Sequence, residues 1–260
     1  QGLSKEDLLL AVRRHATSKI RAEDDLCRIT SMGFRGEALA SIASISKFSI
    51  ASREQGSPCG WKLCVDGGEL SPLLEWNGQS GTTVIVEDLF FNVPARIKFL
   101  KSTQSEYAHI LELLNAIVLA RPDISFILKH QNKERLRTEA CVNSSKENAW
   151  DEKTLRTRAS DLLEKNIVER LLYVMNEDEY GTFTGLISPP GMEKPTSKSI
   201  TTFANHRWVK DKTLRYGILR GYHSHLLKGQ YPLVITNYQC HPSLVDVNVH
   251  PTKAELRFQY

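Results

Sequence analysis

The sequence predicts an α+β fold made of two domains. Apolar residues at helical spacing recur along the chain, and they alternate with short β-branched runs that are joined by glycine-containing turns. The length of 260 residues allows one large domain or two modest ones, and a polar, weakly periodic stretch at 141–155 divides the chain. We therefore expect one domain over residues 1–150 and a second over residues 151–260.

Helix signals open the N-terminal half. Ser4 and Asp7 resemble a capping box, and the apolar residues of 8–12 continue the helical spacing to about residue 14. Residues 33–36 form a loop punctuated by glycine, and residues 37–43 follow with helical propensity and small side chains that suit close packing. A flexible loop therefore leads into the start of a helix.

Strands and turns dominate the rest of this half. The Asp-Gly-Gly turn at 66–68 separates two strand-like runs and predicts a hairpin, while the run at 82–86 is β-branched almost throughout. Pro122 ends the long helix that precedes it. The expected elements are strands at 48–51, 61–65, 70–76 and 82–86, a helix at 105–120, and a second hairpin with strands at 124–128 and 135–138.

Helices and strands also alternate in the second half. Asp211 is placed to cap a helix, and a loop rich in Pro, Gly and Ser occupies 188–198. Valines alternate with polar residues over 244–250, which predicts a half-buried strand closed by Pro251. The expected elements are a helix at 156–165, strands at 171–175, 181–187 and 199–204, a helix at 211–227, and a strand at 232–238.

The composition excludes several classes of protein. It is 41% hydrophobic and 25% charged, as in ordinary globular proteins, and no apolar run approaches the ~18 residues that a membrane helix needs. The five cysteines contain no Cys-x-x-Cys pair, so we expect neither a disulfide framework nor a metal site, and we infer a reducing compartment. No G-x-S-x-G or S-x-x-K stretch indicates nucleophilic hydrolysis.

Positive charge is concentrated in the second half. Residues 1–155 contain 20 Lys and Arg against 20 Asp and Glu, whereas residues 156–260 contain 14 against 10 and so supply the whole net charge of +4. Within residues 194–228, eight basic residues face the single acid Asp211. Such a cluster attracts phosphate backbones, and it is equally typical of a solvated helix face, so both interpretations stay open on charge alone.

Several short segments suit phosphate binding, and each also has an ordinary structural explanation. Glycine in 33–36 lets the backbone approach an anion, and Arg35 adds a forked cation, but the spacing matches neither a Walker loop nor a dinucleotide-binding fingerprint. The polar residues 17–19 suit a triphosphate and its metal ion, or a helix end. Thr82 is also explained by β-propensity, and Lys253 by solvation of a surface loop.

Taken together, four segments resemble the MutL family of DNA mismatch-repair proteins. They are HATSKI at 15–20, GFRGEALASIASIS at 33–46, GTTVIVEDLFFNVPARIKFL at 81–100 and VDVNVHPTKAELRF at 245–258. They occur in the family's order and span nearly the whole chain. The resemblance implies a GHKL-type ATP-binding α/β sandwich followed by a ribosomal-protein-like α/β second domain. It also implies a clamp that uses ATP and Mg²⁺, closes by N-terminal dimerisation and binds DNA without sequence preference.

The resemblance assigns roles to individual residues. Lys253 matches the lysine that reaches from the second domain to the γ-phosphate, which is the catalytic role expected in this chain. Contacts to DNA are expected from Arg207, Lys210 and Lys212. The residues expected to bind ATP are Gly2, Thr17, Ser18, Lys19, Gly33, Arg35, Gly36, Ala38, Leu39 and Thr82.

The resemblance also sets limits and suggests partners. The family's activating glutamate, Mg²⁺-binding asparagine and adenine-reading aspartate lie upstream of Gln1, so this chain is expected to be a fragment that hydrolyses ATP poorly. Expected partners are DNA, a second copy or a paralogue, a mismatch-recognition protein and a repair endonuclease, in the cytoplasm of a bacterium or the nucleus of a eukaryote. The alternatives are a non-catalytic DNA-binding module with an incomplete nucleotide site, and a gyrase-like protein, against which residues 247–253 argue.

Overall fold

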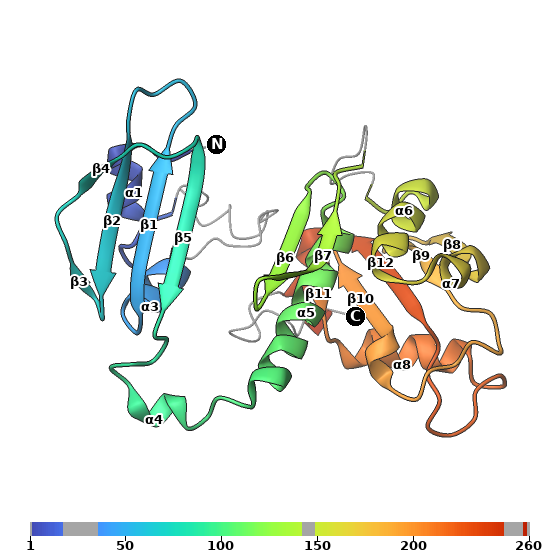
Figure 1. Ribbon diagram of the computed structural model, residues 1–260. Coiled ribbons are helices and arrows are strands. Elements are labelled where there is room, and N and C mark those ends of the chain that lie inside the picture. Colours follow the sequence, from blue (N-terminus) through green and yellow to red (C-terminus); the bar gives the residue numbers. More distant parts are fainter. Residues whose placement is uncertain (1, 18–35, 142–148, 247–256, 259–260) are drawn as a thin grey trace. The chain divides into compact units, whose positions relative to one another are not determined.

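The computed structural model forms two compact units, residues 1–106 and residues 107–260, each of which combines helices with a β-sheet (Figure 1). The α+β class expected from the sequence is therefore confirmed. The structure describes residues 2–17, 36–141, 149–246 and 257–258.

The first unit is an antiparallel sheet with two helices on one face. Its strands run in the order β3-β2-β1-β5, and β4 also pairs with β2. Leu8 and Ala43 from the two helices pack against Phe48, Ile50 and Leu63 of the sheet, and this cluster is the core of the unit. The elements are α1 (Lys5–Ala11), α3 (Ala38–Ala43), β1 (Lys47–Arg53), β2 (Gly60–Asp66), β3 (Glu69–Leu70), β4 (Leu74–Trp76), β5 (Gly81–Glu87) and α4 (Pro94–Ile97).

Local sequence explains how this unit begins. The Ser4 hydroxyl accepts a hydrogen bond from the Asp7 backbone N–H at 3.1 Å, so the expected cap of α1 is confirmed. The single strand expected at 70–76 is wrong, because the chain leaves β2 after Leu70 and pairs with it again from Leu74. Pro72 lies between the two pairings, and proline cannot donate to a β-ladder.

The second unit contains a five-stranded sheet in the order β11-β10-β12-β9-β8 and a separate β6-β7 hairpin. β10 and β12 are parallel, and α8 lies between them in the sequence as the crossover that parallel strands require. The elements are α5 (Thr103–Ala120, beginning before the unit boundary), β6 (Phe126–His130), β7 (Lys133–Thr138), α6 (Glu152–Leu162), α7 (Lys165–Arg170), β8 (Leu172–Glu177), β9 (Gly181–Ile187), η1 (Ser197–Ser199), β10 (Ile200–Ala204), β11 (Arg207–Val209), α8 (Lys212–Gly221), β12 (Val234–Cys240), η2 (Pro242–Leu244), β13 (Val245–Asp246) and β14 (Arg257–Phe258).

Both faces of this sheet carry apolar clusters. Phe203 packs with Ala116 of α5, Leu155 of α6 and Val168 of α7, whereas the next residue, Ala204, packs in a cluster with Leu214 of α8. Successive side chains of a strand point to opposite faces, so α5, α6 and α7 cover one face and α8 lies against the other.

The linker expected at 141–155 is wrong in its last part. Ala149 and Trp150 are 0% and 5% exposed and belong to the main apolar cluster, and α6 already begins at Glu152. The boundary predicted near residue 150 falls inside the second compact unit. The division of the chain into an ATP-binding domain and a second domain at that residue stays a prediction. The helix expected at 156–165 is two helices, and the helix expected at 211–227 ends at Gly221.

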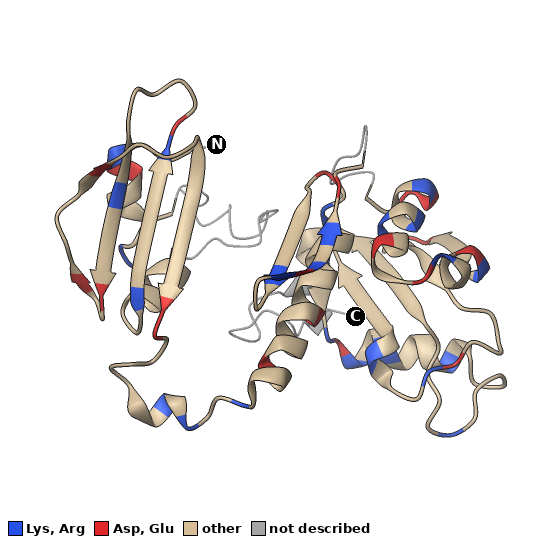
Figure 2. Ribbon diagram, in the orientation of Figure 1, with Lys and Arg blue, Asp and Glu red and all other residues tan. Residues whose placement is uncertain are grey.

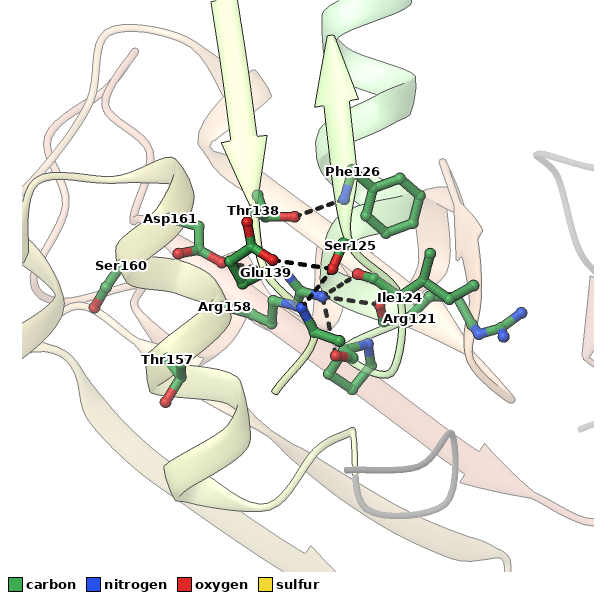
Figure 3. A network of polar contacts seen from close by, with 12 residues as sticks. Arg121, Ile124, Ser125, Phe126, Thr138, Glu139, Thr157, Arg158, Ser160 and Asp161 are labelled. Carbon is green, nitrogen blue, oxygen red and sulfur yellow. Dashed lines mark hydrogen bonds and ion pairs between the residues drawn. The ribbon is translucent and has the colours of Figure 1, made fainter. Parts of the chain in front are cut away.

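A buried arginine ties α6 to the turn between α5 and β6. The Arg158 side chain is completely buried, and its Nη2 donates to the carbonyl oxygens of Arg121, Pro122 and Ile124. Its Nη1 lies 3.1 Å from a carboxylate oxygen of Asp161 (Figure 3). Because one planar guanidinium serves four acceptors, it fixes the orientation of the helix relative to the turn.

Candidate functional site

Residues expected around a nucleotide meet at Ser52 in the first unit. The Ser52 hydroxyl lies 2.8 Å from the Thr82 hydroxyl and donates to the Gly81 carbonyl at 3.0 Å, while it accepts from the Leu3 N–H at 2.7 Å. A serine has one hydrogen to donate, so Thr82 is the donor to Ser52 when Ser52 donates to Gly81. Three segments that are distant in the sequence are joined by this one buried hydroxyl.

Gly2 lies against the end of the same strand. A Cβ built on Gly2 would be 2.0 Å from the carbonyl oxygen of Arg53, which is far inside contact distance. Only glycine allows the two backbones to approach this closely. Gly2 and Thr82, both expected to bind ATP, are therefore neighbours of one residue pair, Ser52 and Arg53.

A second group of expected residues lies where α3 begins. The His15 N–H donates to the Gly36 carbonyl at 3.1 Å, and the His15 ring lies 3.6 Å from the Glu37 carboxylate. Gly36 has a φ of +61°, and a Cβ there would be 2.2 Å from the Ala16 carbonyl oxygen. The described ends of the chain on either side of 18–35, at Thr17 and Gly36, are thus held side by side.

The remaining expected ATP-binding residues divide into described and undescribed positions. Ala38 is exposed at the first position of α3, and Leu39 is partly buried against the core of the unit. Four expected ATP-binding residues and the expected catalytic lysine lie outside the described residues; these are Ser18, Lys19, Gly33, Arg35 and Lys253.

The expected DNA-contact residues lie at the β11-α8 junction of the second unit. Lys212 is the exposed first residue of α8. Lys210 Nζ lies 2.6 Å from Glu112 Oε1 of α5 and 4.6 Å from the centre of the Trp208 ring. Burial lowers the pKa of the Arg207 guanidinium from its ordinary value, although an arginine remains charged at neutral pH. The three residues therefore differ in how freely a phosphate can reach them.

Further cations surround this junction. Figure 2 shows basic residues along α8, and these include Arg215 and Arg220. The α8 helix is capped by Asp211, whose carboxylate accepts from the Leu214 N–H at 2.8 Å, as the sequence predicts. The cap orients α8 so that its exposed N-terminal residue follows directly on β11.

Sequence reasoning missed Ser52, Glu112 and Trp208. Ser52 and Glu112 become informative only through a partner far along the chain, namely Thr82 for Ser52 and Lys210 for Glu112, whereas Trp208 contacts the nearby Lys210. The one signal available for Ser52 was a small hydroxyl residue at the end of an apolar strand. Within the described part of the chain there is no group of three metal-ligating side chains and no helix long and apolar enough to cross a membrane.

Sequence comparisons with known proteins cover nearly the whole chain. A family model described as "DNA mismatch repair protein, C-terminal domain" matches residues 159–260. The DNA mismatch repair protein MutL of Geobacter sulfurreducens is 39% identical over 258 residues, which are 99% of this chain and 41% of that protein. MutL of Streptococcus agalactiae is 38% identical over 257 residues, which are 99% of this chain and 37% of that protein.

Solved structures show the same fold. The MutL ATPase domain of Aquifex aeolicus, complexed with ADP, has a TM-score of 0.60 and 26% identity, and the match covers 85% of this chain and 76% of that one. The N-terminal domain of a DNA repair protein has a TM-score of 0.75 at 24% identity, and the match covers 99% of this chain and 77% of that one. The chain spans about two fifths of the length of the curated relatives above. It belongs to the MutL family of DNA mismatch-repair proteins and corresponds to its ATPase region.

Proposed function

We propose that the protein is an ATP-dependent clamp of DNA mismatch repair, which binds ATP with Mg²⁺ under a lid, closes by N-terminal dimerisation and binds DNA non-specifically. The observation that carries the nucleotide part is the close approach of Ala16 to Gly36, because Gly36 belongs to the segment 33–39 that resembles the family's ATP lid and Ala16 directly precedes the segment 17–19 that is expected to flank the nucleotide. The ADP complex of the related Aquifex domain supports it.

The described residues fit a nucleotide. The missing Cβ atoms of Gly2 and Gly36 let the backbone of Arg53 and of Ala16 pack against them, which brings the expected nucleotide-binding segments together, and Thr82 is an exposed residue bonded to the buried Ser52. We assign Gly2 and Thr82 to the nucleoside side. The phosphates are assigned to Thr17, Ser18, Lys19, Gly33, Arg35, Gly36, Ala38 and Leu39, with Lys253 reaching the γ-phosphate. Bound ATP supplies binding energy that differs between the open and closed states, and the residues around it convert that difference into closure.

Protection from proteolysis tests the nucleotide proposal. We expect a non-hydrolysable ATP analogue with Mg²⁺ to slow trypsin cleavage at Arg35 by about tenfold, because a bound nucleotide stabilises the closed form of the loop. Cleavage at Lys153, an exposed residue of α6, should be unchanged and serves as the internal control. Equal cleavage at Arg35 with and without the analogue would contradict nucleotide binding, and would favour the alternative of a non-catalytic DNA-binding module.

The basic β11-α8 junction supports the DNA part of the proposal. Arg207, Lys210 and Lys212 present cations from one short stretch, and a duplex binds such a stretch through its phosphates regardless of sequence. We further propose that the whole protein forms a homodimer or pairs with a paralogue. A mismatch-recognition protein and a repair endonuclease are its proposed partners in repair.

Salt dependence measures the contribution of each lysine to DNA binding. We expect Lys212→Ala to lower duplex affinity and to reduce the slope of log K against log salt concentration by about 0.9, the value for one phosphate contact. Lys210→Ala should do the same only if Lys210 leaves Glu112 on binding. Fluorescence anisotropy between low and physiological salt gives both quantities. Lys153→Ala is the matched control, and an unchanged slope for Lys212→Ala would remove this residue from the interface.

A further inference from the structure

A cavity of about 330 Å³ lies in the second unit between α5, η1, β10, β11 and α8. Its charged lining, among the described residues, consists of Lys198, Lys210, Arg215 and the carboxylate of Glu112. The three Lys and Arg side chains against the one carboxylate leave a net charge of two positive. A terminal phosphate monoester carries about −1.5 to −2 charges at neutral pH, whereas each diester of a nucleic acid chain carries about −1, so the lining matches the monoester.

The rest of the lining combines polar side chains, among them Asn115 and Thr201, with apolar ones such as Leu119. The volume is at the lower end of the range for small-molecule sites, which suits a mononucleotide.

The ion pair at the cavity positions one of the cations. Lys210 Nζ is held 2.6 Å from Glu112 Oε1 and over the Trp208 ring. Lys198 of η1 is exposed, and Arg215 of α8 is partly buried, so the cations come from three separate segments. Cations that line one concave space from three segments are placed to contact one anion together, whereas a solvated helix face would carry them on one convex element.

We propose that this cavity binds the terminal phosphate monoester of a nucleotide, carried either by a DNA end or by a free mononucleotide. The phosphate is held by Lys198, Lys210 and Arg215. The inference deepens the proposed DNA binding, because Lys210 takes part in both. It differs from that proposal in its ligand, since a duplex presents diesters on a convex surface.

Calorimetric titration of the whole chain with thymidine 5′-monophosphate tests the proposal. We expect saturable 1:1 binding, and we expect Lys198→Ala and Arg215→Ala each to weaken it by about tenfold or more, as the loss of a charge-assisted hydrogen bond does. Lys153→Ala is the control, because Lys153 is an exposed cation of α6 that does not line the cavity; the affinity of this variant should stay within about twofold of that of the unsubstituted chain. Thymidine, which has no phosphate, should not bind.

Oligonucleotides with and without a 5′-phosphate identify the source of the monoester. Tighter binding of the phosphorylated one indicates a DNA end, and binding of the mononucleotide alone indicates a free nucleotide. The cavity proposal is overturned if thymidine 5′-monophosphate does not bind, or binds the Lys198→Ala and Arg215→Ala variants as well as the parent. Duplex binding without monophosphate binding leaves the proposed function intact, and the reverse result removes the DNA proposal while leaving the cavity.

Discussion

Replacing Arg158 with alanine is expected to lower the free energy of unfolding of the second unit by about 1–3 kcal/mol, the range for leaving a buried hydrogen-bonding group without its partner. The side chain is fully buried, and its loss removes the donor that the structure shows for the Ile124 carbonyl, whereas the Arg121 and Pro122 carbonyls still accept from the N–H groups of Ile124 and Cys141. The loss of the ion pair costs Asp161 little, because its side chain is 29% exposed and water can solvate the carboxylate. Urea unfolding followed by circular dichroism measures the change.

Two further variants separate the network from a general effect on α6. Lys153→Ala alters an exposed residue of the same helix and should change stability by less than about 0.5 kcal/mol. Arg158→Lys keeps the positive charge but loses the planar guanidinium. The stability of this variant should lie between those of Arg158→Ala and Lys153→Ala, since one ammonium group cannot reach all the acceptors. If Arg158→Ala were as stable as Lys153→Ala, the Arg158 network would make no measurable contribution to the stability of the fold.

The Arg158 network also bears on how movement could pass along the chain. It joins α6 to the turn that follows α5 by hydrogen bonds to two carbonyl groups of that turn (Figure 3). Glu112 of α5 is in turn paired with Lys210 next to β11. We therefore expect a displacement of α5 to shift both α6 and the β11-α8 junction, because closely packed elements transmit strain.

Local signals predicted most elements, and long-range pairings account for what they missed. The Ser4 and Asp211 caps depend on residues three positions away, and both were predictable. The polar neighbours of Trp150 in the sequence predict a linker. In the structure Trp150 is buried in the main apolar cluster, where its ring centre lies 4.9 Å from that of Phe203. Burial of this kind cannot be read from a window of neighbouring residues.

The candidate site shows the same division. Glycine and hydroxyl residues flagged the nucleotide segments, yet the contact of Ser52 with Thr82 depends on the register of β1 against β5. A shift of that register by one residue would turn Thr82 to the other face. The pairing of Glu112 with Lys210 likewise needs the tertiary fold, which brings α5 to the end of β11. Residue type and spacing could nominate members of the site but not their partners.

Replacing Gly36 with alanine is expected to separate the two chain ends that flank 18–35. The new Cβ would lie 2.2 Å from the Ala16 carbonyl oxygen, and both atoms belong to or adjoin the backbone, so the chain must move. The hydrogen bond from the His15 N–H to the Gly36 carbonyl should then open, and amide exchange at His15 should accelerate by about tenfold or more. Protection of Arg35 by the ATP analogue should be lost with it.

Gly56→Ala is the matched control for this change, because it separates backbone strain from steric conflict. Gly56 also has a positive φ, +84°, but a Cβ there meets no atom within 4 Å. Both variants carry the cost of placing an L-residue at positive φ, about 1 kcal/mol, and only Gly36→Ala forces two chain segments apart. Faster exchange at His15 in both variants would show that general loss of stability is responsible. Faster exchange in Gly36→Ala alone, with loss of nucleotide protection, would show that the approach of Ala16 to Gly36 is what the nucleotide requires.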